Sequence, residues 1–316
     1  MDTRKPLDAG AAAAMASLCL IWALQQIVLK ATAAEFAPLL QIALRSGIAA
    51  ALVWLLMLAR RERPSLADGN WRAGLAVGLL FALEFLLLGE AVRRTSASHL
   101  VVLLYTAPIF AALGLHWRLP EERLRPAQWL GILLSFSGIA LTFFSRTGAS
   151  SGALRGAASS MLWGDALAVL AGLAWGATTV LVRCTRLARA PATQTLLYQL
   201  AAAFVLLLAA AIALGQTRFS ATPLAWSVLA FQSLIISFAS YLAWFGLLRR
   251  YLASQLGTFS FMTPLSGIVL GAWLLGEAIE PAFLGGAALV LAGIVLVSGH
   301  AWLGRRIRAV MTRPQI

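Results

Sequence analysis

Charged side chains are scarce in this sequence. Asp, Glu, Lys and Arg make up 12% of its 316 residues, whereas a soluble domain carries about 25%. Hydrophobic residues contribute 60% of the chain, and the mean hydropathy is +0.84. This balance excludes an ordinary soluble domain and indicates a membrane protein.

Acidic residues are rarer than basic ones: 12 Asp and Glu face 25 Lys and Arg, for a net charge of +13. In a soluble chain such an excess would suggest a nucleic-acid partner. Here the basic residues cluster in short gaps between apolar runs, where orientation in a membrane explains them better. We therefore expect membrane lipid as a partner and no nucleic acid.

Cysteine and catalytic motifs are also nearly absent. Cys19 and Cys184 are too few to build a disulfide framework or a metal site. The sequence contains no HExxH or GxxxxGK[ST] motif, and its one nucleophile-elbow match, Gly148 to Gly152, lies in a linker with no predicted strand. We expect no cofactor and no enzymatic activity. An intramembrane enzyme or a lipid-handling scaffold is the alternative from a different class.

Long apolar runs, in contrast, fill the chain. A helix needs about 20 apolar residues to cross the hydrocarbon core. Ten runs reach this length: 9–30, 37–59, 71–92, 96–117, 126–145, 161–182, 192–214, 223–247, 251–275 and 281–303. The first resembles a secretory signal peptide, but it is long enough to span, so we expect it to be retained as helix 1.

The distribution of Lys and Arg orients these ten helices. With the N-terminus inside, the cytoplasmic segments hold eighteen Lys and Arg, the outer loops hold six, and Arg45 lies within a span. This bias predicts that both termini are cytoplasmic. We expect a multi-pass protein of the bacterial inner membrane.

The two halves of the chain are similar to each other. Residues 9–146 and 161–303 form two five-helix units, joined by a Gly/Ser linker at 147–160 and followed by a basic cytoplasmic tail at 304–316. Matched positions include Trp22/Trp175, Arg93/Arg249, Ser98/Ser254, Pro108/Pro264, Glu121/Glu277, Gly131/Gly286 and Gly138/Gly293. Because each unit has an odd number of spans, the second must be inverted. Inverted repeats are typical of secondary transporters, whose substrate site lies near the midplane between the repeats.

Two stretches carry a specific family resemblance. ASHLVVLLYTAPIFAALGLHWRLPEERLRPAQWLGILLSFSGIAL, from Ala97 to Leu141, and its partner from Ala253 to Leu296 resemble the signature half of EamA-type members of the drug/metabolite transporter superfamily. The resemblance implies an all-α membrane protein, with ten helices in a 5+5 inverted repeat. It also implies export of small metabolites by alternating access. Arg45 departs from the repeat pattern, because its mate in the second half is Tyr198.

The repeated prolines Pro108 and Pro264 lie near the middle of helices 4 and 9. Proline removes a helical hydrogen bond, and in lipid the freed carbonyl must face protein or a water-filled cavity. The functional interpretation is a kink or hinge beside the substrate path. The alternative is an ordinary kink satisfied by a neighbouring helix.

Two charged residues lie inside spans. Glu84 in helix 3 can bind a proton or a substrate ammonium group, and Arg45 in helix 2 can bind a substrate carboxylate. Equally open is a structural ion pair between them. Glu90 is expected to pair with Arg93 or Arg94, about one turn away.

Several aromatic residues are expected at membrane depth, on the wall of a central cavity between helices 1, 3, 4, 6, 8 and 9. Close helix packing is the alternative for each of them. They are Trp22, Tyr105, Trp175, Tyr241, Trp244 and Phe261. Glu121 and Glu277, which end helices 4 and 9 on opposite faces, predict a structural or gating contact. His99 is expected to be an interfacial histidine and not a proton relay.

These features together predict a secondary exporter of small molecules. Amino acids are the expected substrates, since the aromatic amino acid exporters are the branch of the family whose substrates would suit an aromatic cavity. A multidrug exporter of the same fold is the alternative. Protons are the candidate coupling ion.

Overall fold

The predicted spans appear as helices. The computed structural model describes residues 8–62, 70–144, 152–251, 256 and 259–311. Within this part, seven segments are long and apolar enough to cross a membrane and three shorter helices are apolar, matching the ten predicted spans. The helices are α1 (Ala9–Ala31), α2 (Pro38–Ala59), α3 (Asn70–Val92), α4 (Ala97–Leu104), α5 (Ala107–Arg118), α6 (Pro126–Phe144), α7 (Gly152–Arg183), α8 (Ala192–Ala213), α9 (Pro223–Ala230), the π-helical segment η3 (Phe231–Ser240), α10 (Tyr241–Arg250), α12 (Met262–Leu275) and α13 (Pro281–Met311).

Helix starts follow from local sequence. Four of the helices begin at a proline, which lacks the amide hydrogen that the first turn would leave unbonded. Elsewhere a side chain caps the first turn: Asp8, Ser96 and Thr222 accept hydrogen bonds from the backbone three residues on. At the other end of α12, Gly276 has a φ of 63°, the left-handed conformation that stops a helix at little cost.

Two boundaries differ from the prediction. Helix α7 begins at Gly152, so the predicted flexible linker is helical over 152–160, while its residues 147–151 lie outside the described part. The alanines at 153, 157 and 158 favour a helix more strongly than the neighbouring glycine and serine oppose it. Helix α13 continues to Met311, so the predicted basic tail starts as a helix.

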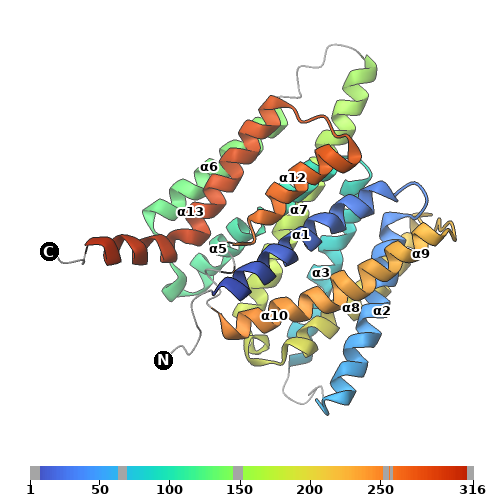
Figure 1. Ribbon diagram of the computed structural model, residues 1–316, viewed down its shortest axis with the longest axis horizontal. Coiled ribbons are helices and arrows are strands. Elements are labelled where there is room, and N and C mark those ends of the chain that lie inside the picture. The colour runs from blue at the N-terminus through green and yellow to red at the C-terminus, as the bar shows by residue number, and fades with distance from the viewer. Residues whose placement is uncertain (1–7, 63–69, 145–151, 252–255, 257–258, 312–316) are drawn as a thin grey trace.

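Helices α6 and α13 run antiparallel with their backbones in close contact (Figure 1). A β-carbon placed on Gly131 would lie 2.6 Å from the carbonyl oxygen of Gly293, and one on Gly138 would lie 2.5 Å from that of Gly286. Each glycine thus meets the repeat mate of the other. Between them, Ser135 donates a hydrogen bond to the carbonyl of its own mate, Val290 (3.2 Å). Such reciprocal contacts require a two-fold axis through this crossing.

Two further helix pairs agree with the same two-fold relation. Helix α2 packs on its mate α8, and α4 packs on α12, as α6 does on α13. The α6–α13 and α2–α8 pairs lie at opposite edges of the bundle (Figure 1). Because α6 and α13 span the membrane in opposite directions, the axis lies in the membrane plane. The predicted 5+5 inverted repeat is confirmed.

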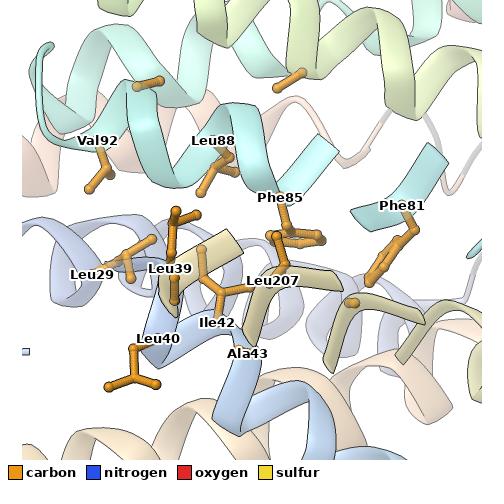
Figure 2. Close-up of a cluster of buried hydrophobic side chains, with 14 of the residues drawn as sticks. Leu29, Leu39, Leu40, Ile42, Ala43, Phe81, Phe85, Leu88, Val92 and Leu207 are labelled. Carbon is orange, nitrogen blue, oxygen red and sulfur yellow. The ribbon is translucent and has the colours of Figure 1, made fainter. Parts of the chain in front are cut away.

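The interior between α1, α2, α3 and α8 is an apolar cluster. Figure 2 shows Leu29, Leu39, Phe85, Leu88 and Leu207 directed toward one another from these helices. Large apolar side chains also cover the outer surface of the bundle, where lipid replaces water; Leu55, Val205 and Trp273 are 59%, 61% and 76% exposed. Apolar side chains are therefore found both in the interior, against other helices, and on the outer surface, against lipid.

The glycine contact gives a stability test on α13. Gly286→Ala places a methyl group against Thr142 and 2.8 Å from the Gly138 carbonyl, so α6 and α13 must move apart. We expect a loss of about 1–3 kcal/mol, seen as a lower Tm of the purified protein in detergent. The neighbouring Gly285→Ala is the control, because its methyl group would meet only Leu141 at 3.5 Å. Equal Tm values for the two variants would contradict the close contact.

Candidate functional site

A π-helical segment, η3, lies in the middle of the predicted span 223–247, between α9 and α10. The ten residues of η3 separate α9 from α10 and bury Gln232, Ser237 and Ser240 between the helices. Wider π turns are frequent at functional sites because they rotate side chains away from α-helical positions. The sequence carries no signal for this segment, and Gln232 was not predicted as a site residue.

Arg45 lies next to this segment, on α2. Its side chain is among the largest fully buried ones, and its Nη1 donates a hydrogen bond to Oε1 of Gln232 (2.5 Å). Its guanidinium carbon lies 4.8 Å from the ring centroid of Phe85, a cation–π distance. Gln232 in turn donates to the backbone carbonyl of Gln25 (3.3 Å). Within the described part of the chain, Nε of Arg45 has no hydrogen-bond partner.

Glu84 brings the opposite charge from α3. Its side chain is buried, and it interacts electrostatically with Arg45 and with Tyr241. Among the described residues, however, no ion pair within 4 Å joins Glu84 to Arg45. The direct structural pair left open by the sequence is therefore not formed. A buried guanidinium and a buried carboxyl group thus interact electrostatically without a direct contact.

The aromatic residues gather in two groups. In one, the rings of Tyr105 and Trp175 meet edge to face at 5.3 Å, and Phe261 packs in the same cluster. In the other, the rings of Trp22 and Trp244 meet edge to face at 5.6 Å. Both groups join opposite halves of the chain. Tyr105 also interacts electrostatically with Glu84 and Tyr241, so the first group adjoins the charged pair.

The two groups are not symmetric. Nε1 of Trp22 donates a hydrogen bond to the hydroxyl of Ser240 (3.0 Å), and Ser240 is the repeat mate of Glu84. The equivalent contact in the other half would join Trp175 to Glu84, but no such bond forms among the described residues. Among the described residues, Glu84 therefore has no counterpart of the Trp22–Ser240 hydrogen bond.

The prolines break both helices that flank this region. Helix α4 ends at Leu104 and α5 begins at Ala107, just before Pro108; α12 begins at Met262, two residues before Pro264. The hydroxyl of Thr106 donates to the Leu103 carbonyl (2.6 Å). The Leu104 carbonyl lies against Gly172 of α7, where an added β-carbon would be 2.9 Å away. Freed carbonyls therefore face protein, as the hydrocarbon requires.

Two hollows lie near α1 and away from the charged pair. One of about 270 Å³ lies between α1 and α12, and one of about 530 Å³ lies between the start of α1 and the end of α10. Leu18 and Leu247 line the larger hollow and pack in the same cluster as Trp22 and Trp244. The predicted central cavity stays a prediction.

A further buried acid was missed by the sequence analysis. Asp165 on α7 is fully buried and contacts Thr95 and His99. It is the only aspartate within a predicted span, and this signal was available. Its partners, 66 and 70 residues away, were not predictable from sequence spacing.

Comparison with known proteins adds to this geometry. The model of the EamA-like transporter family matches residues 10–144 and again 162–299. An uncharacterized protein of Pseudomonas aeruginosa is 34% identical, covering 84% of this chain and 87% of that protein. The uncharacterized transporter YoaV of Bacillus subtilis is 24% identical over 89% of this chain and 94% of its own length.

The fold also recurs among solved structures. One crystal structure superposes with a TM-score of 0.64, at 20% identity, and covers 95% of this chain and 99% of its own. Two family matches span nearly the whole chain, the relatives share its full length, and the helices form the inverted repeat expected of the family. The chain therefore belongs to the EamA-like transporter family and is a multi-pass membrane transporter.

Proposed function

We propose that this transporter exports amino acids from the cytoplasm across the bacterial inner membrane. Substrate would bind at the midplane between the repeats, beside Arg45, Glu84 and Tyr241, with an aromatic wall of Tyr105, Trp175 and Phe261. Both termini would be cytoplasmic, as the Lys and Arg bias predicts.

The separated pair of buried charges carries this proposal. Arg45 and Glu84 are both buried, interact electrostatically and make no direct ion pair within 4 Å. Removing two charges from water is costly unless each finds a partner. An α-amino acid supplies both partners, because its carboxylate can bind the guanidinium and its ammonium group can bind the carboxylate. A multidrug exporter would have less use for paired opposite charges.

The aromatic wall favours substrates with flat or apolar side chains. Tyr105 meets Trp175 edge to face and adjoins Glu84 electrostatically. A ring bound here would gain edge-to-face or stacking contacts of about 0.5–1.5 kcal/mol. Aromatic amino acids are thus the best candidates within the proposed class.

Movement between the repeats would give alternating access. We take residues 9–146 and 161–303 as the two moving units, with the breaks before Pro108 and Pro264 as hinges. Glu84 would release a substrate ammonium group and accept a proton in its place, since both compete for one carboxylate. Proton entry would then be exchanged for substrate exit.

The decisive experiment is transport by the full chain in proteoliposomes. A panel of labelled aromatic, aliphatic and charged amino acids, with an organic cation as the multidrug probe, is tested with and without a pH gradient. We expect aromatic amino acids to be transported fastest, and faster with the gradient. Transport of the cation alone would overturn the amino acid assignment.

Glu84→Gln tests the ammonium contact. The amide keeps the shape but loses the charge, so binding of amino acids should weaken about tenfold or more, while analogues that lack the amino group should bind as before. Stimulation of net efflux by a pH gradient should disappear. Exchange between equal pools should remain measurable, because the neutral amide imitates the protonated state.

A stable Glu84→Gln variant with unchanged affinity and unchanged response to the gradient would exclude both roles of this carboxylate. Glu280→Gln, at an exposed position, controls for the loss of one acidic group.

Trp175→Leu tests the aromatic wall. We expect the KM for aromatic amino acids to rise about three- to tenfold, with little change for aliphatic ones, in the same liposome assay. Trp273→Leu is the matched control, because Trp273 is 76% exposed on the lipid-facing side of α12. Parallel changes for both substrate types would assign Trp175 to helix packing instead.

A further inference from the structure

A second buried polar cluster lies away from the midplane, at the start of α4. Nδ1 of His99 is 3.0 Å from Oδ2 of Asp165, and the hydroxyl of Thr95 donates to the other carboxylate oxygen. Both ionisable side chains are buried, at 4% and 0% exposed. The imidazole is also stacked on Phe283, with the ring centres 3.9 Å apart. Histidine and aspartate therefore meet in a site closed to solvent.

Glu277 binds the same turn of α4 from the other side. Its carboxylate accepts hydrogen bonds from the backbone amides of Ala97 (2.6 Å) and Ser98 (3.0 Å) and from the Ser98 hydroxyl (2.6 Å). Lys30, at the end of α1, donates to the carbonyls of Val92 and Thr95 (2.6 and 2.7 Å). It also interacts electrostatically with Glu277. The sequence predicts a structural or gating contact for Glu277, and these hydrogen bonds form a structural contact between the repeats.

These bonds close one end of the molecule across the repeat boundary. Lys30, Thr95 and His99 belong to the first repeat, while Asp165 and Glu277 belong to the second. The Lys and Arg bias assigns this end to the outside. The 530 Å³ hollow lies at the opposite end of α1, among Gly10, Ala11 and Ala14. Opening a path to the outside between the two repeats here requires that α4 separates from α7 and from the segment after α12.

We propose that this cluster is the outer gate of the transporter and that the His99–Asp165 pair is a proton-binding site that controls it. A proton on the imidazole places a positive charge opposite the carboxylate and turns their hydrogen bond into an ion pair, which holds α4 on α7. Loss of that proton weakens the contact, because opposite unit charges in contact attract strongly where water is excluded. External acid would thus hold the gate shut. The proposal rests on membrane transport, but not on the identity of the substrate.

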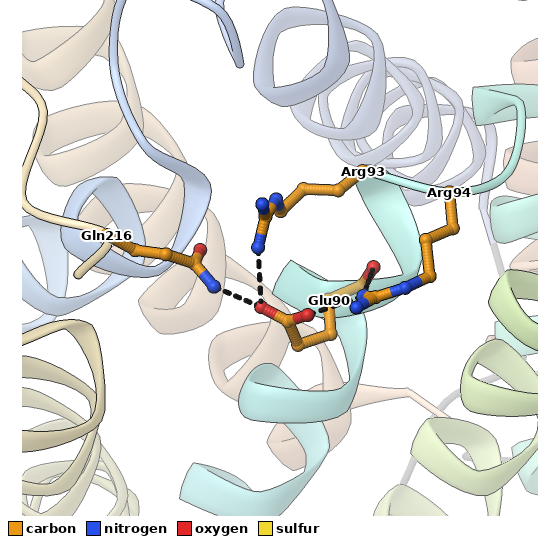
Figure 3. Close-up of polar contacts among 4 residues, drawn as sticks. All are labelled: Glu90, Arg93, Arg94 and Gln216. Atoms are coloured by element: carbon orange, nitrogen blue, oxygen red, sulfur yellow. Dashed lines mark hydrogen bonds and ion pairs between the residues drawn. The ribbon is translucent and has the colours of Figure 1, made fainter. Parts of the chain in front are cut away.

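The other charged groups around α4 do not account for such a switch. Lysine and arginine stay protonated between about pH 5 and pH 8, the range in which histidine exchanges its proton. Glu90 is already paired with Arg93 and Arg94 and accepts from Gln216 (Figure 3). Glu277 accepts three hydrogen bonds from the first turn of α4. Helices α1, α3, α7, α12 and α13 pack on α4. The charged groups at this end of those elements are Lys30 on α1, Glu90, Arg93 and Arg94 at the end of α3, Asp165 on α7, and Glu277 and Glu280 between α12 and α13.

The native cysteines provide a reporter of gate opening. Cys19 is buried in the middle of α1, where its thiol lies 3.4 Å from the Phe259 carbonyl, and Cys184 is exposed at the inner end of α7. In a Cys184→Ser background, a membrane-impermeant maleimide added outside right-side-out vesicles labels Cys19 only when the outer gate opens. Labelling rates are divided by those of a model thiol at the same pH, which removes the reagent's own pH dependence.

We expect labelling of Cys19 to accelerate at least about fivefold between about pH 5 and pH 8 outside. His99→Gln, which cannot take up a proton there, should label fast at both pH values. His116→Gln is the matched control, since His116 lies at the inner end of α5 and accepts from Leu124; it should behave like the parent. A pH response that survives His99→Gln, or that is absent from the parent, would overturn the proton-binding site.

Glu277→Gln tests the gate separately from its sensor. The amide cannot accept all three hydrogen bonds from α4, so Cys19 should label faster at both pH values while the ratio between them remains. Unchanged labelling would contradict the gate. Asp165→Asn replaces His99→Gln if that variant does not fold, with the same loss of pH response expected. The labelling assay needs no substrate, so its outcome is independent of whether the transported substrate is an amino acid.

Discussion

Hydrocarbon supplies no hydrogen-bond partners, so every polar group in the span must find one within the protein. Several of the polar residues described above follow this constraint. Arg45 reaches Gln232 and the ring of Phe85, and Asp165 is bonded by Thr95 and His99. The carbonyls freed by Pro108 lie against α7. Glu84 interacts with Arg45 only at a distance greater than an ion pair, and for this reason we propose it as a substrate contact.

The polar groups shared between the two repeats lie at two depths in the membrane. At the midplane, where the broken helices of both repeats meet, the buried charges of Arg45 and Glu84 are only partly compensated. At the outer end, Glu277 and Asp165 close contacts between the repeats with well-formed hydrogen bonds. Weakly compensated charge suits a site that must accept and release a ligand, whereas the bonded cluster suits a gate that holds until it is switched.

Composition and periodicity were sufficient to predict the fold, because span length, the Lys and Arg bias and the repeat are properties of the sequence itself. The breaks near Pro108 and Pro264 were predictable for the same reason. The partners of the buried charges were not. Gln232 binds Arg45 although the two residues are 187 positions apart in the sequence, and it belongs to a π-helical segment that has no sequence signature. His99 looked interfacial because Asp165, on another helix, could not be placed beside it.

The crossing of α6 and α13 sets a limit on how this chain can change. At the two-fold axis a residue meets its own counterpart, as in a homodimer, so Ser135 faces Val290 and the flanking glycines exchange partners. At this crossing, a larger side chain on α6 fits only if the facing part of α13 changes as well, and the reverse is also true. Away from the axis no such condition applies, and Arg45 and Glu84 have the unlike mates Tyr198 and Ser240. The α6–α13 crossing is therefore constrained to stay symmetric, whereas the surroundings of Arg45 and Glu84 are free to differ between the two repeats.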